Sequence, residues 1–224
     1  MQYVVIDLEM CNVAKLYQKS YPYKSEIIQI GAVLLDENLE VTDKFNEYVK
    51  PKYGDLDHFI KKLTGISKLD LSRADEFPVV FERFSEWIPK ENVAMVSWSM
   101  TDRSQLMREM EVKNIPVDEH FQEMFETWID CQPQFAEKMN MGTKQYSLEE
   151  ALIATDIIEE GRAHDGLADA HNTALLYVKM QKEETLVLNK YYQKAVNGHK
   201  EEPLTYSMGD LIEQAMQKKE KRKK

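Results

Sequence analysis

Apolar positions in the first fifty residues fall into three runs with the composition of β-strands. Residues 3–10 are rich in β-branched side chains and predict a buried strand. Residues 26–35 predict a second strand and residues 41–49 a third, with turn-forming residues at 36–38 between them. This order predicts an antiparallel meander at the start of the chain.

The rest of the chain alternates between helical spacing and short apolar runs. Short strands are expected over residues 93–98 and at 128–129. Helices are expected over residues 57–63, 79–87, 102–110, 133–139, 147–154 and 166–182. A meander followed by alternating helices and strands predicts an α/β fold with a mixed sheet flanked by helices. Residues 183–224 are expected to form a C-terminal helical extension that ends in a basic tail.

The first predicted strand breaks its apolar pattern at Asp7 and Glu9. Side chains at positions i and i+2 of a strand point to the same face, so the two carboxylates project together. Two like charges ~5 Å apart repel by roughly 3 kcal/mol at an effective dielectric constant near 20. A bound divalent cation is the simplest group that neutralises such a pair. The strand therefore predicts a metal site, and further ligands are expected elsewhere.

Asp102 is one candidate for a further ligand. It follows the predicted strand at residues 93–98 and opens the next predicted helix. Ligands of α/β proteins gather at strand ends, which favours a place in the site. An aspartate at the start of a helix is equally typical of an N-cap. The local pattern leaves both interpretations open.

Residues 164–170 supply the other candidates. Asp169 lies on a helix face that otherwise carries small and apolar residues, where a carboxylate is costly unless it is paired or metal-bound. His164 precedes this helix, and an imidazole can take a proton from an attacking water. Taken alone, His164 is equally an ordinary surface histidine. Asp165 is a rival ligand that we expect to be more exposed.

Composition narrows the class of protein. The 224 residues are 43% hydrophobic and 30% charged, as in soluble globular proteins. No apolar run approaches the ~18 residues of a membrane span, and no secretory leader is evident, so no membrane association is expected. The two cysteines, Cys11 and Cys131, are far apart, which favours a reducing cytoplasm.

Charge is unevenly distributed. The net charge is −10, but residues 218–224 (KKEKRKK) carry +5, so the remainder carries −15. An acidic body argues against a broad contact with long duplex nucleic acid. The acidic charge is compatible with a small metal-lined pocket that binds the end of a nucleic-acid strand.

The motifs together resemble the DnaQ-like, or DEDDh, 3′–5′ exonuclease superfamily of the RNase T and polymerase III epsilon type. The resemblance lies in Asp7 and Glu9, in residues 97–102 (SWSMTD) with Leu106, and in residues 164–174 (HDGLADAHNTA). Residues 26–32 (EIIQIGA), 49–51 (VKP) and 63–66 (LTGI) are similar to further features of the family. The match covers about residues 2–182.

This resemblance implies an RNase H-like fold with a five-stranded mixed sheet, formed by an exonuclease domain over residues 1–182. It also implies two Mg²⁺ or Mn²⁺ ions, held by Asp7, Glu9, Asp102 and Asp169. One ion would orient the attacking water and the other would stabilise the leaving 3′-oxygen. His164 would be the general base.

Finer features of the resemblance favour RNA. Met10-Cys11-Asn12 stands where proofreading enzymes usually have Thr-Thr-Gly, which is similar to histone-stem-loop exoribonucleases and to the bacterial sporulation-inhibitor group. Residues 203–211 are similar to an extension of the latter group. Single-stranded 3′ ends are the expected partner, with RNA favoured over DNA. Leu8 and Met10 are expected to flank the terminal nucleotide, although both are equally typical of a core.

The expected function is therefore a metal-dependent 3′–5′ exonuclease that releases nucleoside 5′-monophosphates. One alternative is a binding or regulatory module on the same fold, and another is a hydrolase of very short oligonucleotides. Tyr17, Tyr21 and Tyr23, interleaved with lysines, predict either a wall for single-stranded substrate or a solvated loop. Trp98 is expected to be a core residue rather than a base-stacking one.

Overall fold

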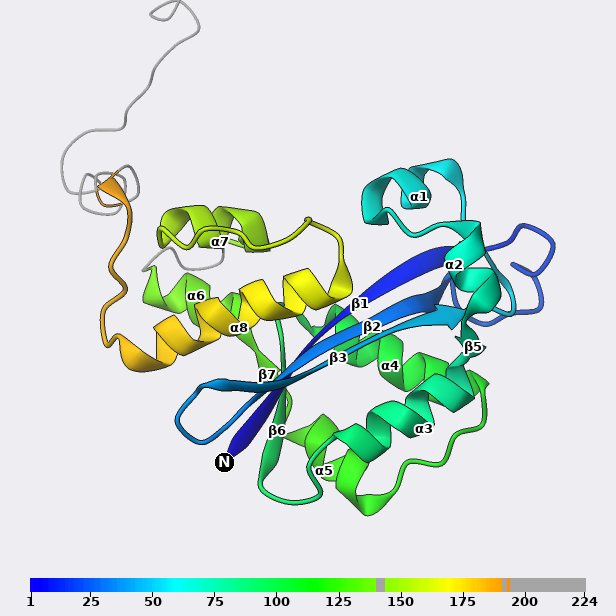
Figure 1. Ribbon diagram of the computed structural model, residues 1–224, viewed down its shortest axis with the longest axis horizontal. Helices are drawn as coiled ribbons and strands as arrows, with labels where there is room; N and C mark the ends of the chain where they lie inside the picture. Colours follow the sequence, from blue (N-terminus) through cyan, green and yellow to red (C-terminus); the bar gives the residue numbers. More distant parts are fainter. Residues whose placement is uncertain (140–143, 191–192, 194–224) are drawn as a thin grey trace, which may run out of the picture. The chain divides into compact units, whose positions relative to one another are not determined.

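The computed structural model describes residues 1–139, 144–190 and 193 (Figure 1). Met1–Leu188 forms one compact unit, to which all the elements below belong. Asn189–Lys224 is a separate unit of which residues 189, 190 and 193 are described. The expected C-terminal extension therefore lies largely outside the described residues, and both its helical character and the boundary at residue 182 stay predictions. None of the described helices combines the length and apolarity needed to cross a membrane.

A mixed sheet with the strand order β5-β3-β2-β1-β6-β7 forms the centre of the unit, and β4 pairs with β1. The strands are β1 (Gln2–Val13), β2 (Ser25–Leu35), β3 (Val41–Lys50), β4 (Gly54–Asp55), β5 (Asp75–Glu76), β6 (Val93–Ser97) and β7 (Ile129–Asp130). The described residues thus form seven strands, where five were expected. The additional β4 and β5 have two residues each, too few for any periodic pattern to reveal.

The central strand is β1, which pairs antiparallel with β2 and parallel with β6. Its apolar side chains are buried on both faces, as expected of a strand with helices on either side. In the β1–β2 register, Asp7 lies opposite Gly31 and Glu9 opposite Gln29. The register shifts by one residue between Glu9 and Met10, so the strand is irregular directly after its two carboxylates.

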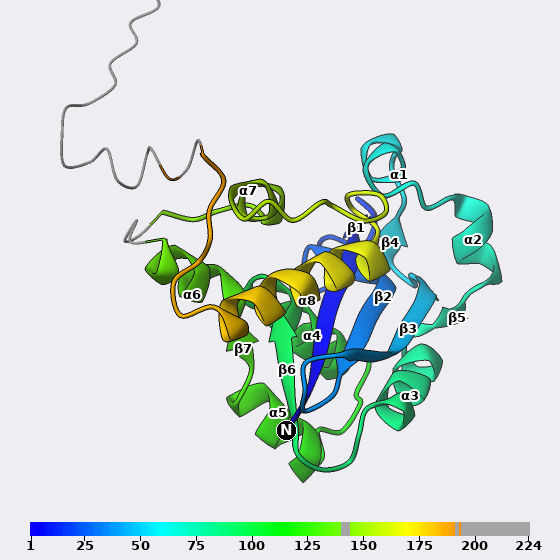
Figure 2. The same ribbon diagram turned by 60° about the vertical axis from the view of Figure 1, so that its left-hand side comes forward.

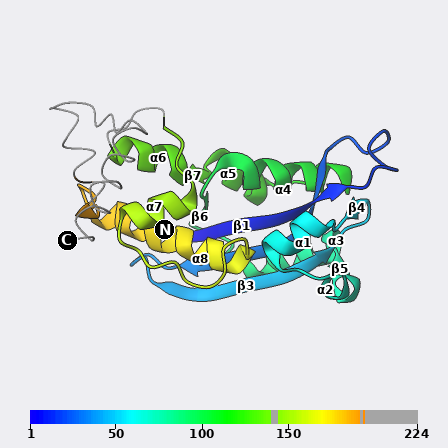
Figure 3. The same ribbon diagram turned by 90° about the horizontal axis from the view of Figure 1, so that it is seen from above.

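Helices cover both faces of the sheet (Figures 2 and 3). They are α1 (His58–Thr64), α2 (Lys68–Arg73), α3 (Phe77–Trp87), α4 (Met100–Val112), α5 (Glu119–Glu126), α6 (Cys131–Lys138), α7 (Leu148–Ala154) and α8 (Gly166–Lys182). The sequence patterns above did not predict α2, which has six residues, or α5, although its buried Phe121, Met124 and Phe125 follow helical spacing. The main core lies between the sheet and α3, α4 and α5.

The first turn of α8 lies directly on β1 and β2, on the face opposite the main core. A Cβ atom on Gly31 would come within 2.0 Å of the carbonyl carbon of Gly166, so only glycine permits this approach. The amide of Gly166 donates to the side-chain oxygen of Gln29 at 3.1 Å. This contact places the start of α8 over the part of β1 that carries Asp7.

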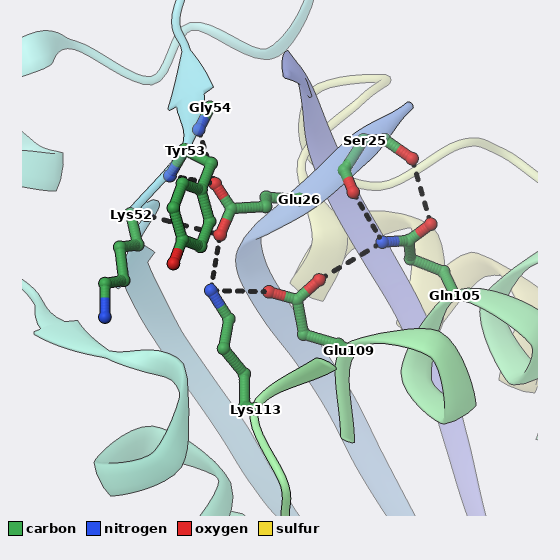
Figure 4. Close-up of polar contacts among 8 residues, drawn as sticks. All are labelled: Ser25, Glu26, Lys52, Tyr53, Gly54, Gln105, Glu109 and Lys113. Carbon is green, nitrogen blue, oxygen red and sulfur yellow. Dashed lines mark hydrogen bonds and ion pairs between the residues drawn. The ribbon is translucent and has the colours of Figure 1, made fainter. Parts of the chain in front are cut away.

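A buried polar network lies where β2 begins, opposite the part of β1 that follows Glu9 (Figure 4). Glu26 is fully buried and accepts hydrogen bonds from the backbone amides of residues 52–54. The ammonium group of Lys113 contacts Glu26 at 2.5 Å and Glu109 at 3.7 Å. Burial raises the pKa of Glu109 to about 7. The network ties β2, the turn before β4 and the end of α4 together.

Replacing Glu26 by alanine should lower the free energy of unfolding by about 3–5 kcal/mol, because it leaves a buried ammonium without its main partner and three amides unsatisfied. Urea denaturation of both proteins measures the difference. Glu47→Ala is the matched control, because its partner Arg83 is 41% exposed and such a pair contributes at most about 1 kcal/mol. Equal losses in the two variants would contradict the importance of the network.

Candidate active site

Four carboxylates from three elements meet where α8 approaches β1. Asp7 and Glu9 come from β1, Asp102 from the first turn of α4, and Asp169 from the first turn of α8. Glu9 is 8% exposed and Asp102 6% exposed. Each of these side chains lies near enough to the others to alter their ionisation.

Asp102 points into the site and does not cap its helix. The N-cap of α4 is Ser99, whose hydroxyl accepts from the amide of Thr101 at 3.3 Å. One carboxylate oxygen of Asp102 instead accepts from the backbone amide of Leu8 at 3.1 Å. The capping interpretation of Asp102 is therefore wrong, and its bond to Leu8 fixes the aspartate against β1.

His164 lies beside Glu9 and Asp169. One possible ligand atom from each of these three residues can be chosen so that all lie within 4.8 Å of one another. His164 adopts a left-handed backbone conformation with φ of 62°, and its amide donates to Asp169 at 2.9 Å. Its exposed side chain remains accessible to a substrate. A non-glycine residue held in this conformation is a feature that clusters at functional sites.

Asp165, the alternative candidate for a metal ligand, caps helix α8 instead. Its carboxylate accepts from the amides of Leu167 at 3.1 Å and Ala168 at 3.2 Å, so it is the N-cap of α8. This cap starts the helix at the place where Asp169 meets the strand carboxylates. We therefore assign Asp165 to positioning the helix.

Two further residues hold the loop that carries His164, and the sequence did not reveal either. Asn172 is fully buried and exchanges two hydrogen bonds with the backbone of Glu160, at 2.9 and 3.0 Å. The guanidinium of Arg162 donates to the carbonyls of Lys62 and Leu63 at the end of α1. The contact of Arg162 joins segments 100 residues apart, and no local pattern indicates the role of either residue.

The electrostatics of the cluster favour a bound cation. Burial, followed by repulsion from Asp102 and Asp169, raises the pKa of Asp7 well above its ordinary value. The same causes, again led by burial, raise the pKa of Glu9 to about 8. Burial raises the pKa of Asp102 to about 7 and also raises that of Asp169. Clustered carboxylate oxygens are the ligands of Mg²⁺ and Mn²⁺, so the residues present fit such ions.

Metal binding should stabilise the fold more at pH 8 than at pH 6. The ions bind the ionised carboxylates, and raised pKa values leave these groups partly protonated at pH 6. Ions at 100 times their dissociation constant add about 2.7 kcal/mol to the free energy of unfolding. Melting curves with Mn²⁺ and with EDTA at both pH values measure this. Identical curves at pH 8 would contradict a metal site.

The two residues expected to contact the substrate, Leu8 and Met10, differ in their exposure. The side chain of Leu8 is 3% exposed and packs in the main core, whereas Met10 is partly exposed beside the site. A contact of either with the terminal nucleotide stays a prediction, although burial favours the core alternative for Leu8. Trp98 is 9% exposed and its indole donates to the carbonyl of Tyr146 at 3.1 Å, as expected of a core residue.

The tyrosines after β1 match neither expectation completely. The segment is not an unoccupied wall for single-stranded substrate, and it is not solvated along its whole length. Tyr21 is 7% exposed, and its ring packs against that of Tyr53 at a centroid distance of 4.9 Å. Tyr17 packs on the same ring at 5.2 Å. Tyr23 remains partly exposed. Two of the three tyrosines therefore belong to a local aromatic cluster.

Comparison with known proteins identifies the family to which the chain belongs. A family model described as RNase_T, Exonuclease, matches residues 4–177. The rat (Rattus norvegicus) protein 3'-5' exoribonuclease 1 is 28% identical over 166 residues, which cover 69% of this chain and 46% of the relative. The zebrafish (Danio rerio) protein ERI1 exoribonuclease 2 is 30% identical over 200 residues, covering 79% of this chain and 34% of the relative. The chain thus spans less than half of the length of these relatives.

Solved structures of exonucleases have a similar fold. The nuclease domain of 3'hExo, a DEDDh family member bound to rAMP, superposes with a TM-score of 0.70 at 25% identity, covering 84% of this chain and 96% of that domain. Cell-death related nuclease 4 (CRN-4), whose curated counterpart is from Caenorhabditis elegans, gives a TM-score of 0.67 at 25% identity, covering 92% and 72%. With four clustered carboxylates, an adjacent histidine and a family match over most of its length, the chain belongs to the RNase_T family of exonucleases, whose DEDDh members depend on divalent metal ions.

Proposed function

We propose that this protein hydrolyses the last phosphodiester bond at the 3′ end of single-stranded nucleic acid and releases nucleoside 5′-monophosphates. The observation that carries the proposal is the convergence of Asp7, Glu9, Asp102 and Asp169 beside His164. An acidic cluster of this kind repels a phosphodiester unless cations are bound, so it is suited to metal-assisted hydrolysis.

Each residue has a role that follows from its position. Asp7, Glu9, Asp102 and Asp169 would hold two ions, Mg²⁺ or Mn²⁺. Such a pair of ions supplies an activated water and neutralises the charge that develops on the leaving 3′-oxygen. His164 is placed to accept the proton of the attacking water, because its side chain is exposed and lies beside Glu9 and Asp169.

RNA is the favoured substrate. The support is that similar proteins are named exoribonucleases, and that the 3'hExo nuclease domain was solved with rAMP bound. The motif Met10-Cys11-Asn12 after the strand carboxylates points the same way.

Degradation of 5′-labelled single-stranded RNA and DNA of equal sequence tests the proposal, with Mn²⁺, Mg²⁺ or EDTA. The proposal predicts a ladder that shortens from the 3′ end, requires the metal, and forms faster on RNA. A 3′-phosphorylated copy of each strand is the control, because a blocked end should resist attack. Cleavage that begins inside the strand, or that proceeds equally in EDTA, would contradict the proposal.

A further inference from the structure

A hollow of about 520 Å³ lies at the end of β1, beyond the carboxylates. One wall is formed by residues 12–15, 18, 23 and 24, and the other by Asp55 and Asp57, which precede α1. We call it the strand-end groove. Its volume lies within the range of pockets that hold small ligands, and the roles proposed above for the site residues make no use of it.

The two lysines that line this groove have no ion-pair partner among the described residues, whereas its two aspartates each make contacts of their own. Asp57 accepts from the amide of Ile60 as the N-cap of α1 and from the side chain of Asn12 at 3.2 Å. Asp55 pairs with Lys68 at 3.4 Å. Lys15 and Lys24 line the groove with exposed ammonium groups, and no described residue forms an ion pair with either. The groove therefore offers two unpaired ammonium groups to a ligand, beside two carboxylates that keep their charge but already have partners.

An aromatic ring that is held by two side-chain contacts also lines the groove. Tyr23 lines the groove, its hydroxyl donates to Glu111, and the guanidinium of Arg108 lies 5.5 Å from the ring centroid. Cationic side chains next to a held aromatic ring are how proteins bind a single strand without reading its sequence. Phosphates and bases of one strand match this surface.

The walls are rigid because buried contacts support them. The network around Glu26 fixes the turn that leads to Asp55 (Figure 4), and Tyr53 in that turn packs against Tyr17 and Tyr21, which lie between residues of the opposite wall. A groove shaped before the ligand arrives loses less conformational entropy on binding than a mobile one.

The same strand connects the groove to the carboxylates. Asn12 follows Glu9 by three residues of β1, which corresponds to ~10 Å along the strand. A nucleic acid whose 3′ end occupies the carboxylate site can therefore reach the groove within a few nucleotides.

We propose that the strand-end groove binds the phosphate backbone of the single strand upstream of the 3′ nucleotide, through Lys15 and Lys24. This inference rests on the proposed function, because it assigns the groove to the same substrate. It adds that the enzyme acts better on strands long enough to fill the groove than on dinucleotides.

The test compares Lys15→Ala/Lys24→Ala with the control Lys19→Ala/Lys44→Ala. Both pairs remove two positive charges from exposed positions, but Lys19 and Lys44 do not line the groove. For a decanucleotide we expect kcat/KM to fall about tenfold in the groove variant and to stay within about twofold in the control. The slope of log(kcat/KM) against log[KCl] should become shallower by about 1.4, since each contact with a single strand contributes about 0.7. Dinucleotide hydrolysis should not change in either variant.

Binding of a fluorescent decanucleotide in EDTA separates this inference from the proposed function. If the groove variant alone loses affinity, the result supports the groove, whether or not the wild-type protein hydrolyses the strand. If the wild-type protein hydrolyses nothing, that result overturns only the proposed function. An active wild type whose groove and control variants bind and hydrolyse the decanucleotide equally would overturn the groove. Equal losses on the decanucleotide and the dinucleotide would also overturn it.

Discussion

Replacing Asp7 by asparagine is expected to lower kcat by about 10³-fold or more, which corresponds to a loss on the order of 4 kcal/mol of transition-state stabilisation. Asp7 is central to the cluster, because its ionisation is influenced by Asp102, Asp169 and Glu9 together. The amide has the same shape but supplies no negative charge to a cation. Release of mononucleotides from a decanucleotide at saturating Mn²⁺ measures the effect.

The same change should stabilise the protein in the absence of metal. Burial and the neighbouring carboxylates raise the pKa of Asp7 well above its ordinary value of 3.8, so between the ordinary and the raised pKa the folded protein holds a proton that the unfolded chain releases. The free energy of unfolding therefore falls as the pH rises through this window. Removing one of the repelling carboxylates relieves this loss, and each kcal/mol raises the melting temperature by about 2–4 °C in a protein of this size.

Melting in EDTA at pH 8 is the measurement, with Asp156→Asn as the control. Asp156 is an exposed aspartate outside the cluster, so its replacement changes the net charge equally. An inactive Asp7→Asn protein that melts above the wild type would show that the carboxylate is retained for function at a cost in stability. A variant that is inactive because it is unfolded, or one that remains fully active, would contradict the assignment.

Replacing His164 by alanine should lower kcat by about 10²–10⁴-fold, the usual contribution of a general base. The metal site should survive, because the contact between residue 164 and Asp169 is made by the backbone amide, which alanine retains. We therefore expect the stabilisation by Mn²⁺ to be unchanged. At saturating Mn²⁺, kcat should therefore fall while the metal remains bound.

A kcat profile from pH 5 to 9, paired with melting curves in Mn²⁺, checks this expectation. His58→Ala is the control, because His58 is an exposed histidine at the start of α1. A His164→Ala protein that loses both activity and metal stabilisation would instead assign His164 to metal binding. Unchanged activity would remove it from the mechanism.

The sequence predicted those parts of the fold that local patterns determine. The meander of β1, β2 and β3 and the bounds of α8 follow the distribution of apolar residues, and Ser147 with Glu150 forms a capping box at the start of α7, where a helix was expected. The two strand carboxylates stood out because charges are rare in a buried central strand. The resemblance to a family then linked them to Asp102 and Asp169.

Other parts depend on contacts between distant segments, which no local pattern contains. Whether Asp102 caps its helix was undecidable until its bond to the amide of Leu8 was seen. The close approach of Gly31 and Gly166 and the anchoring of Arg162 on α1 are of the same kind. The strand-end groove was also hidden, because its walls are more than thirty residues apart in the chain.

Crystals grown with Mn²⁺ at pH 8 and measured at a wavelength where manganese scatters anomalously would test the central claim most directly. The account predicts anomalous peaks in contact with the carboxylates of Asp7, Glu9, Asp102 and Asp169, and their loss from crystals of Asp7→Asn. Peaks elsewhere on the protein, with none in contact with Asp7, would contradict the metal site on which the proposed hydrolysis depends.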